Sequence, residues 1–269
     1  MIDMIKLKDV VENYYNLKIK NIEKNTESTD GNVYIIKCGN VKYVIKVYTD
    51  IRHVKSITAL HNYLVTKKFY VPKIITSIQD SNYVTIDNKY IVVFSFLEGN
   101  QLNDIIACGK MDDDIVKNIA KELRRFHDVT NSLTMDFPEI MFASKLKRKS
   151  LLHFDLTKGN IFIKEKQVGF IDFDDAKYGD SVCDLAITIA LLFISKKNGI
   201  DIKKIKMFIK YYYGSDATLM MSEFSFIKKY VISWVDYLLN NNSFDTSLKE
   251  SFKYKKEMIK DIDFIDEII

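Results

Sequence analysis

Three oxygen-bearing side chains, Asp155, Asn160 and Asp172, have types and spacings that could support phosphoryl transfer. Asn160 precedes one apolar run and Asp172 follows another, and the polar residues 165–167 separate the two runs. This pattern predicts a tight β-hairpin. Because antiparallel neighbours lie about 4.8 Å apart, the hairpin would bring Asn160 and Asp172 side by side. Two hard oxygen donors at one edge suit Mg²⁺, which takes few protein ligands and several phosphate oxygens.

Asp155 lies five residues before Asn160, on the loop that leads to the same edge. A carboxylate there could orient a hydroxyl and accept its proton, as phosphoryl transfer requires. Taken singly, each of the three residues would be interpreted as a turn or cap residue, because Asp and Asn favour such positions. The prediction depends on their joint occurrence at this spacing.

The segment 153–160, HFDLTKGN, resembles the kinase catalytic loop H-R-D-L-x-x-x-N except at Phe154, and residues 172–174 resemble the D-F-G motif that follows it. Residues 151–186 resemble more closely the signature of the aminoglycoside phosphotransferase and choline kinase-like superfamily. That signature is H-G-D-L-x-x-x-N, then I-D-F-x-x-A-x-x-G-D-x-x-x-D-L-A. Phe154 replaces its usual Gly and leaves Asp155 unchanged.

The resemblance implies a role for each matching residue. It makes Asp155 the catalytic base, and Asn160 and Asp172 the Mg²⁺ ligands. It also implies that His153 and Asp184 brace the catalytic loop. ATP or GTP would be the phosphate donor, and a small molecule the acceptor.

The same resemblance implies an α+β, bilobal, protein-kinase-like fold. We expect residues 1–97 to form a nucleotide-binding lobe, made of a small antiparallel β-sheet and a helix, that ends in a hinge. We expect residues 98–269 to form a larger, mainly helical lobe that carries the catalytic hairpin and binds the acceptor. The length of 269 residues suits one large domain or two modest lobes.

Composition favours a soluble protein without a nucleic-acid or membrane partner. The 40 basic and 36 acidic residues leave a net charge of only +4, and the basic run 145–149 is more simply a solvated segment than a binding patch. Three cysteines without a CxxC favour a reduced, intracellular protein. The N-terminus does not resemble a secretory signal, and the longest apolar stretch, 185–194, is too short to span a bilayer. We therefore expect a cytoplasmic location.

Hydrophobic periodicity predicts the elements of both lobes. Gly39-Asn40 between β-branched and aromatic runs favours a hairpin, and Asp112–Asp114 can cap a helix that closes at His127. His127 is expected to make a structural hydrogen bond. The predicted strands are 33–36, 43–48, 74–78, 83–86 and 90–94; the predicted helices are 7–16, 115–127, a buried one at 185–194, and 201–213, 222–240 and 247–260.

Lys46 interrupts an apolar strand, where an unpaired charge would be costly. It resembles the Lys with which kinases bind the α- and β-phosphates; alternatively, it points to solvent from an open sheet face. Kinases usually pair this Lys with a helix Glu, but no acid occurs between Asp50 and Asp80, and the position falls at 56–58. The ion pair is therefore missing or is supplied from elsewhere, for example by Asp50.

Ser28 and Gly31 lie in a polar stretch where a kinase has its phosphate-covering loop. No GxGxxG is present, so an ordinary surface loop is an equally good interpretation. Residues 95–99 resemble the inter-lobe hinge of kinases. This resemblance implies that Ser95, Phe96 and Leu97 bond adenine through their backbone, and that Val44 and Phe96 contact it through their side chains.

Carboxylates are unusually dense after the hairpin. Asp175 could assist with metal or acceptor, whereas Asp180 and Asp184 are typical of helix caps and loop braces. The acidic tail 261–267 could attract a polycationic amino-sugar, or it is a solvated helix end. Three functions stay open: a kinase of an aminoglycoside or related amino-sugar; a kinase of a metabolite such as homoserine, choline or a sugar; and a catalytically silent nucleotide-binding relative.

Overall fold

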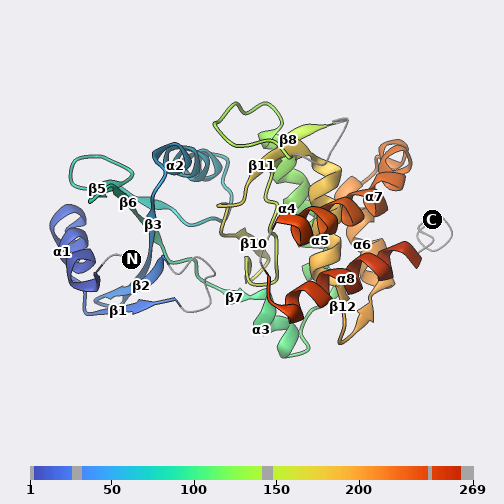
Figure 1. The fold of residues 1–269 in the computed structure, drawn as a ribbon, viewed down its shortest axis with the longest axis horizontal. Helices are drawn as coiled ribbons and strands as arrows, with labels where there is room; N and C mark the ends of the chain where they lie inside the picture. The colour runs from blue at the N-terminus through green and yellow to red at the C-terminus, as the bar shows by residue number, and fades with distance from the viewer. Residues whose placement is uncertain (1–2, 26–31, 141–147, 242–243, 262–269) are drawn as a thin grey trace. The chain divides into compact units, whose positions relative to one another are not determined.

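The structure is a computed structural model that describes residues 3–25, 32–140, 148–241 and 244–261 (Figure 1). The chain divides into two compact units, Met1–Glu98 and Gly99–Ile269. Ser28 and Gly31, and the tail beyond Asp261, lie outside the described residues.

The first unit is built on an antiparallel sheet with strand order β1-β2-β3-β6-β4, in which β5 pairs with β6 outside this path (Figure 1). The register places Lys46 of β3 between Val33 of β2 and Val92 of β6. The strands are β1 (Asn21–Lys24), β2 (Val33–Cys38), β3 (Val41–Tyr48), β4 (Ile74–Ile75), β5 (Val84–Ile86) and β6 (Lys89–Ser95).

Helix α1 (Met4–Tyr15) packs its apolar stripe on one face of this sheet, where Leu7 and Val11 meet Ile36 and Ile45 in a buried core. The spacing of these apolar residues is that of one helical face, and the Tyr15 hydroxyl donates to the Ile91 carbonyl at 2.9 Å. Helix α2 (Ile51–Thr66) contacts β4 and β6. The alternation along β3 turns Lys46 away from the core that contains Ile45.

The second unit is mainly helical. Its central helix α5 is buried on nearly all sides, as a segment without a polar face requires. Helix α4 packs on α6, α5 on α7, and α7 on α8. The helices are α3 (Leu102–Ala107), α4 (Asp113–Thr130), α5 (Ser181–Phe193), α6 (Ile202–Tyr213), α7 (Ala217–Asn241) and α8 (Thr246–Asp261).

Three small antiparallel sheets complete this unit, in the orders β10-β9-β7, β11-β8 and β12-β13. The predicted catalytic hairpin is the β9–β10 pair, and β7 adds a third strand to it. The strands are β7 (Asn100–Gln101), β8 (Lys149–Leu152), β9 (Ile161–Lys164), β10 (Gln167–Phe170), β11 (Lys177–Asp180), β12 (Ile194–Ser195) and β13 (Gly199–Ile200).

The structure confirms the predicted fold class and corrects some boundaries. The strand predicted at 74–78 ends at Ile75, because the Ser77 hydroxyl accepts from the N–H groups of Gln79 and Ser81 and forms a turn. Gln167 belongs to β10 rather than to the turn, and α4 continues past His127 to Thr130.

Candidate active site

The β9–β10 register brings the predicted metal ligands together. Phe170 lies opposite Ile161, and the Ile171 N–H donates to the Asn160 carbonyl at 3.0 Å. Asn160 therefore pairs with the residue directly before Asp172. The backbone of Asp172 has φ +66°, in the left-handed region that Asp tolerates better than most residues. The prediction that the hairpin joins the two ends of the motif is confirmed.

Asp155 is in direct contact with Asn160. The Asn160 Nδ2 donates to the Asp155 carbonyl at 2.8 Å and to the Asp155 Oδ2 at 3.1 Å. A short turn holds this geometry, since the Thr157 N–H donates to the Asp155 carbonyl and the Asn160 N–H to the Thr157 carbonyl. The side chain of Asn160 thus links the predicted base to the hairpin.

Burial raises the pKa of the Asp155 carboxyl, and the negative charges of Asp175 and Asp172 raise it further, to about 7, against the lowering effect of the Asn160 hydrogen bond. A carboxylate with a pKa near the working pH is suited to exchange a proton. Asp155, Asp172 and Asp175 therefore form one electrostatically coupled group.

Asp184 holds the loop that carries Asp155. Its buried carboxylate accepts from the N–H groups of His153 (2.7 Å) and Phe154 (2.9 Å) and from His127 Nε2 (3.0 Å). Burial acts to raise the pKa of Asp184, but the hydrogen bonds and charges of His127 and His153 together outweigh it, and the pKa lies below its usual value. The Tyr212 hydroxyl in turn contacts His127 Nδ1 at 2.7 Å.

His153 fastens the same loop to the strand that precedes Asp172. Its Nε2 lies 2.9 Å from the Ile171 carbonyl, and its ring packs on Phe173 with centroids 4.7 Å apart. Burial lowers the pKa of His153, which favours a neutral imidazole that donates from Nε2. His153 is thus held in a structural position, and the geometry supports the bracing role implied for it.

Asp180 and Asp175 each make a further contact. Asp180 caps α5, accepting from the Val182 N–H at 3.1 Å and from the Tyr230 hydroxyl at 3.2 Å. Asp175 is mostly exposed and pairs loosely with Lys177.

Two long-range contacts were not predicted from the sequence. The Gln101 amide, one residue before α3, donates to the Gly159 carbonyl of the catalytic loop at 3.1 Å. Strand β7 pairs Asn100 with Ile163. The segment that follows residue 99 therefore supports both the loop and the hairpin, although nothing in its composition indicates a partner.

The predicted nucleotide contacts lie in the first unit. Lys46 is half-buried on the sheet face opposite α1, and Val44 is half-buried on the same face. Ser95 ends β6 with its N–H bonded to the Lys73 carbonyl at 2.8 Å, and Leu97 is buried. Phe96 is half-buried, with the Lys42 ammonium 5.2 Å from its ring centroid.

Asp50, which the sequence offered as a substitute partner for Lys46, has another function in the structure. It is the N-cap of α2, where its carboxylate accepts from the Arg52 N–H at 2.8 Å. At the positions where a helix Glu was expected, Ser56 and Thr58 bond back to carbonyls of their own helix.

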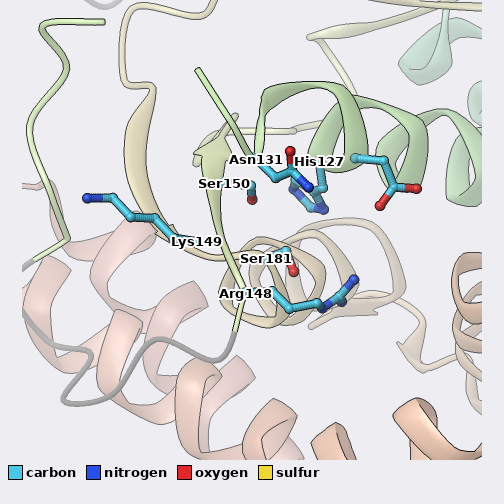
Figure 2. Close-up of a pocket in the computed structure, with 7 residues that line it drawn as sticks. His127, Asn131, Arg148, Lys149, Ser150 and Ser181 are labelled. Carbon is cyan, nitrogen blue, oxygen red and sulfur yellow. The ribbon is translucent and has the colours of Figure 1, made fainter. Parts of the chain in front are cut away.

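A polar cavity of about 360 Å³ lies in the second unit near the Asp184 brace (Figure 2). His127 reaches it from α4, Arg148 and Ser150 from β8 and its approach, and Ser181 from α5. It contains none of the predicted base or metal residues, so it is separate from the candidate active site. Its lining residues are His127, Asp128, Asn131, Arg148, Lys149, Ser150 and Ser181.

Within the described part of the chain, no group of three or more His, Cys, Asp or Glu side chains is arranged to hold a metal ion. Asn160 and Asp172 alone can offer two oxygen ligands, which is the small protein contribution typical of Mg²⁺ bound to a phosphate. Among the described helices, none has the length and apolar character needed to cross a membrane.

The fold is that of small-molecule kinases. The chain superposes on a spectinomycin phosphotransferase in complex with ADP and spectinomycin (TM-score 0.64, 15% identity, 96% of this chain and 97% of that chain). It also superposes on an amicoumacin kinase with AMP-PNP and Ca²⁺ (0.71, 11%, 98% and 97%) and on a microcompartment-associated aminopropanol kinase (0.71, 14%, 96% and 95%).

Residues 137–201, which contain the catalytic loop, the hairpin and Asp184, match the model of a phosphotransferase enzyme family. No curated protein sequence matches the chain. The match and the fold confirm the resemblance that the motifs predicted, and they define the chain as an enzyme of the small-molecule phosphotransferase class.

Proposed function

We propose that the protein transfers the γ-phosphate of ATP or GTP to a hydroxyl of a small molecule, with Asp155 as the catalytic base. The observation that carries this proposal is the contact of Asp155 with Asn160, because Asn160 in turn pairs with Ile171, the residue directly before Asp172. A proton acceptor and two oxygen ligands then share one edge of a hairpin, as phosphoryl transfer requires.

The donor set fits Mg²⁺. The Nδ2 of Asn160 is bonded to Asp155, whereas its Oδ1 accepts no hydrogen bond from a described residue. The Oδ1 of Asn160 and the carboxylate of Asp172 would hold the ion, which neutralises charge on the phosphate oxygens when bound. Asp155 would accept the proton of the attacking hydroxyl, while Asp184 and His153 keep the loop in position.

In the first unit, Lys46 would bind the α- and β-phosphates. Val44, Phe96 and Leu97 would contact the base. Ser95 would contribute through its carbonyl, since its N–H is already bonded. A cytoplasmic location stays a prediction.

The favoured acceptor is an aminoglycoside or a related amino-sugar. The support for it is the coupled group of Asp155, Asp172 and the exposed Asp175, whose negative charge would attract an amine-bearing substrate. The related structures carry the names of different substrates, spectinomycin and aminopropanol among them. The acceptor must therefore be identified by experiment.

A coupled assay of ADP release against aminoglycosides, homoserine, choline and sugars tests the proposal. We expect Asp155→Asn to lower kcat by about 10²- to 10⁴-fold while nucleotide binding is retained, because the base acts on the acceptor. Asp172→Asn should instead remove Mg²⁺-dependent nucleotide binding. The matched control is Asp114→Asn, which alters an exposed acid on α4. Parental turnover by Asp155→Asn would refute the assignment of the base.

A further inference from the structure

Phe154, which replaces the usual Gly, has a conformation that favours glycine. Its φ is +68°, in the left-handed region where bulky residues are rare. Its side chain is nevertheless buried, at 5% exposure. Such an outlier persists where the surroundings hold it in place, and it often marks a functional position.

The surroundings include Lys177 of β11. The Lys177 ammonium lies 4.0 Å from the centroid of the Phe154 ring, a close cation–π contact. The Lys177 ammonium also forms an ion pair with Asp175, at a loose 4.0 Å, and the Lys177 side chain is only 19% exposed. No described residue accepts a hydrogen bond from this ammonium. Three N–H donors are thus withdrawn from most solvent without acceptors, which is costly unless a ligand supplies oxygens.

The position of Lys177 relates it to the catalytic loop. Phe154 is the direct neighbour of Asp155, and the charge of Lys177 interacts with both Asp175 and Asp155. An incoming phosphoryl group would meet the coupled carboxylates Asp155, Asp172 and Asp175. Mg²⁺ would neutralise part of the charge on its oxygens, and a second cation nearby would offset the repulsion from the carboxylates; charge at such a site counts most in the transition state.

We propose that Lys177 is a further catalytic residue, whose ammonium binds a peripheral oxygen of the phosphoryl group during transfer; this inference rests on the proposed function. The bond from phosphorus to the acceptor oxygen forms, and the bond from phosphorus to the β-phosphate oxygen breaks. The hydroxyl proton moves to Asp155, and Lys177 keeps its own protons throughout. Phe154 is a positioning residue that holds the ammonium in place.

The test uses ADP, Mg²⁺ and aluminium fluoride, which together mimic the transferring phosphoryl group and need no known acceptor. Calorimetry measures the affinity for ADP with and without the fluoride. We expect Lys177→Met to weaken the fluoride-dependent gain by about 100- to 1,000-fold, the scale typical of removing one transition-state donor, with ADP affinity unchanged. Lys177→Arg, which keeps the charge, should retain part of the gain.

Lys149→Met is the matched control. Lys149 lies on the paired strand β8, with its ammonium 5.3 Å from the centroid of the Tyr178 ring and an ion pair to Glu139. It should behave as the parental protein. Phe154→Leu keeps Lys177 but removes its aromatic contact, and should give a smaller loss than Lys177→Met. If Lys177→Met does not fold, Phe154→Leu still tests the proposal.

The outcomes separate this inference from the proposed function. If the parental protein binds no ADP with Mg²⁺, the proposed function fails. If it binds ADP and fluoride together, and both Lys177→Met and Phe154→Leu do so equally well, only the role of Lys177 is overturned.

Discussion

Replacing Asp184 with Asn should release the catalytic loop without changing the shape of the side chain. The carboxylate accepts at Oδ1 from the Phe154 N–H and at Oδ2 from the His153 N–H and His127. An amide keeps one acceptor oxygen and brings two N–H donors. Whichever way it is turned, at least one backbone N–H of the loop then faces another donor.

The size of the effect follows from these contacts. A hydrogen bond to a charged group contributes about 1.5–3 kcal/mol, and a buried N–H without an acceptor costs about 1–3 kcal/mol. His127 limits the loss, since it can change tautomer and accept from the amide. We therefore expect Asp184→Asn to lower the free energy of unfolding by about 2–4 kcal/mol and to reduce transfer activity, because Asp155 follows the released N–H groups.

Urea unfolding followed by fluorescence measures this loss in the second unit, where the single tryptophan, Trp234, is buried. Asp128→Asn is the control for the same chemical change, because Asp128 makes an exposed pair with Arg124 that contributes about 0–1 kcal/mol. Because the folded pKa of Asp184 is depressed, its contribution is present above the unfolded pKa and is lost as pH falls through the folded pKa. Equal stability of Asp184→Asn and Asp128→Asn at neutral pH would refute the brace.

Three further predictions concern other contacts. Gly99→Ala should destabilise by about 1–3 kcal/mol, because φ is +103° and a Cβ would lie 2.6 Å from the Ile163 carbonyl oxygen; an unchanged urea midpoint would contradict it. Burial lowers the pKa of Lys255 to about 8, so the unfolded chain binds more protons between about pH 8 and 10.5 and stability should rise there by up to about 3 kcal/mol. The free energy of unfolding measured across that range should rise less in Lys255→Met than in the parental protein. An equal rise in both would show that Lys255 is not its cause. Lys46→Met should raise the nucleotide KM by about tenfold with little change in the urea midpoint, whereas an unchanged KM would favour a Lys46 that does not contact phosphate.

The part of the site that lies close in sequence could be predicted. Asn160 and Asp172 are joined by a hairpin whose apolar runs and polar break are visible in the sequence, and antiparallel pairing leaves one way to bring them together. The buried helix α5 was equally clear, because a helix that is apolar on all sides is stable only where other elements cover it.

The support of the site could not be predicted in the same way. His127 and Asp184 are 57 residues apart, and Gln101 and Gly159 are 58 apart. No periodicity links such residues, because their contacts depend on how α4, α5 and β7 pack. The short strands β8 and β11 were missed for a related reason, since they pair with each other across the whole catalytic loop and hairpin.

The contact between Asn160 and Asp155 also explains why an amide, rather than a second acid, suits this position. The Asp155 Oδ2 lies 3.1 Å from Asn160 Nδ2, so a carboxylate at residue 160 would place two acceptors against each other. It would also add a fourth negative charge beside Asp155, whose pKa the charges of Asp172 and Asp175 already raise. An amide avoids both effects, since it donates to the base through nitrogen and leaves its oxygen for a metal. In the proposed function, proton transfer to Asp155 and metal binding would therefore be coupled through one planar amide group.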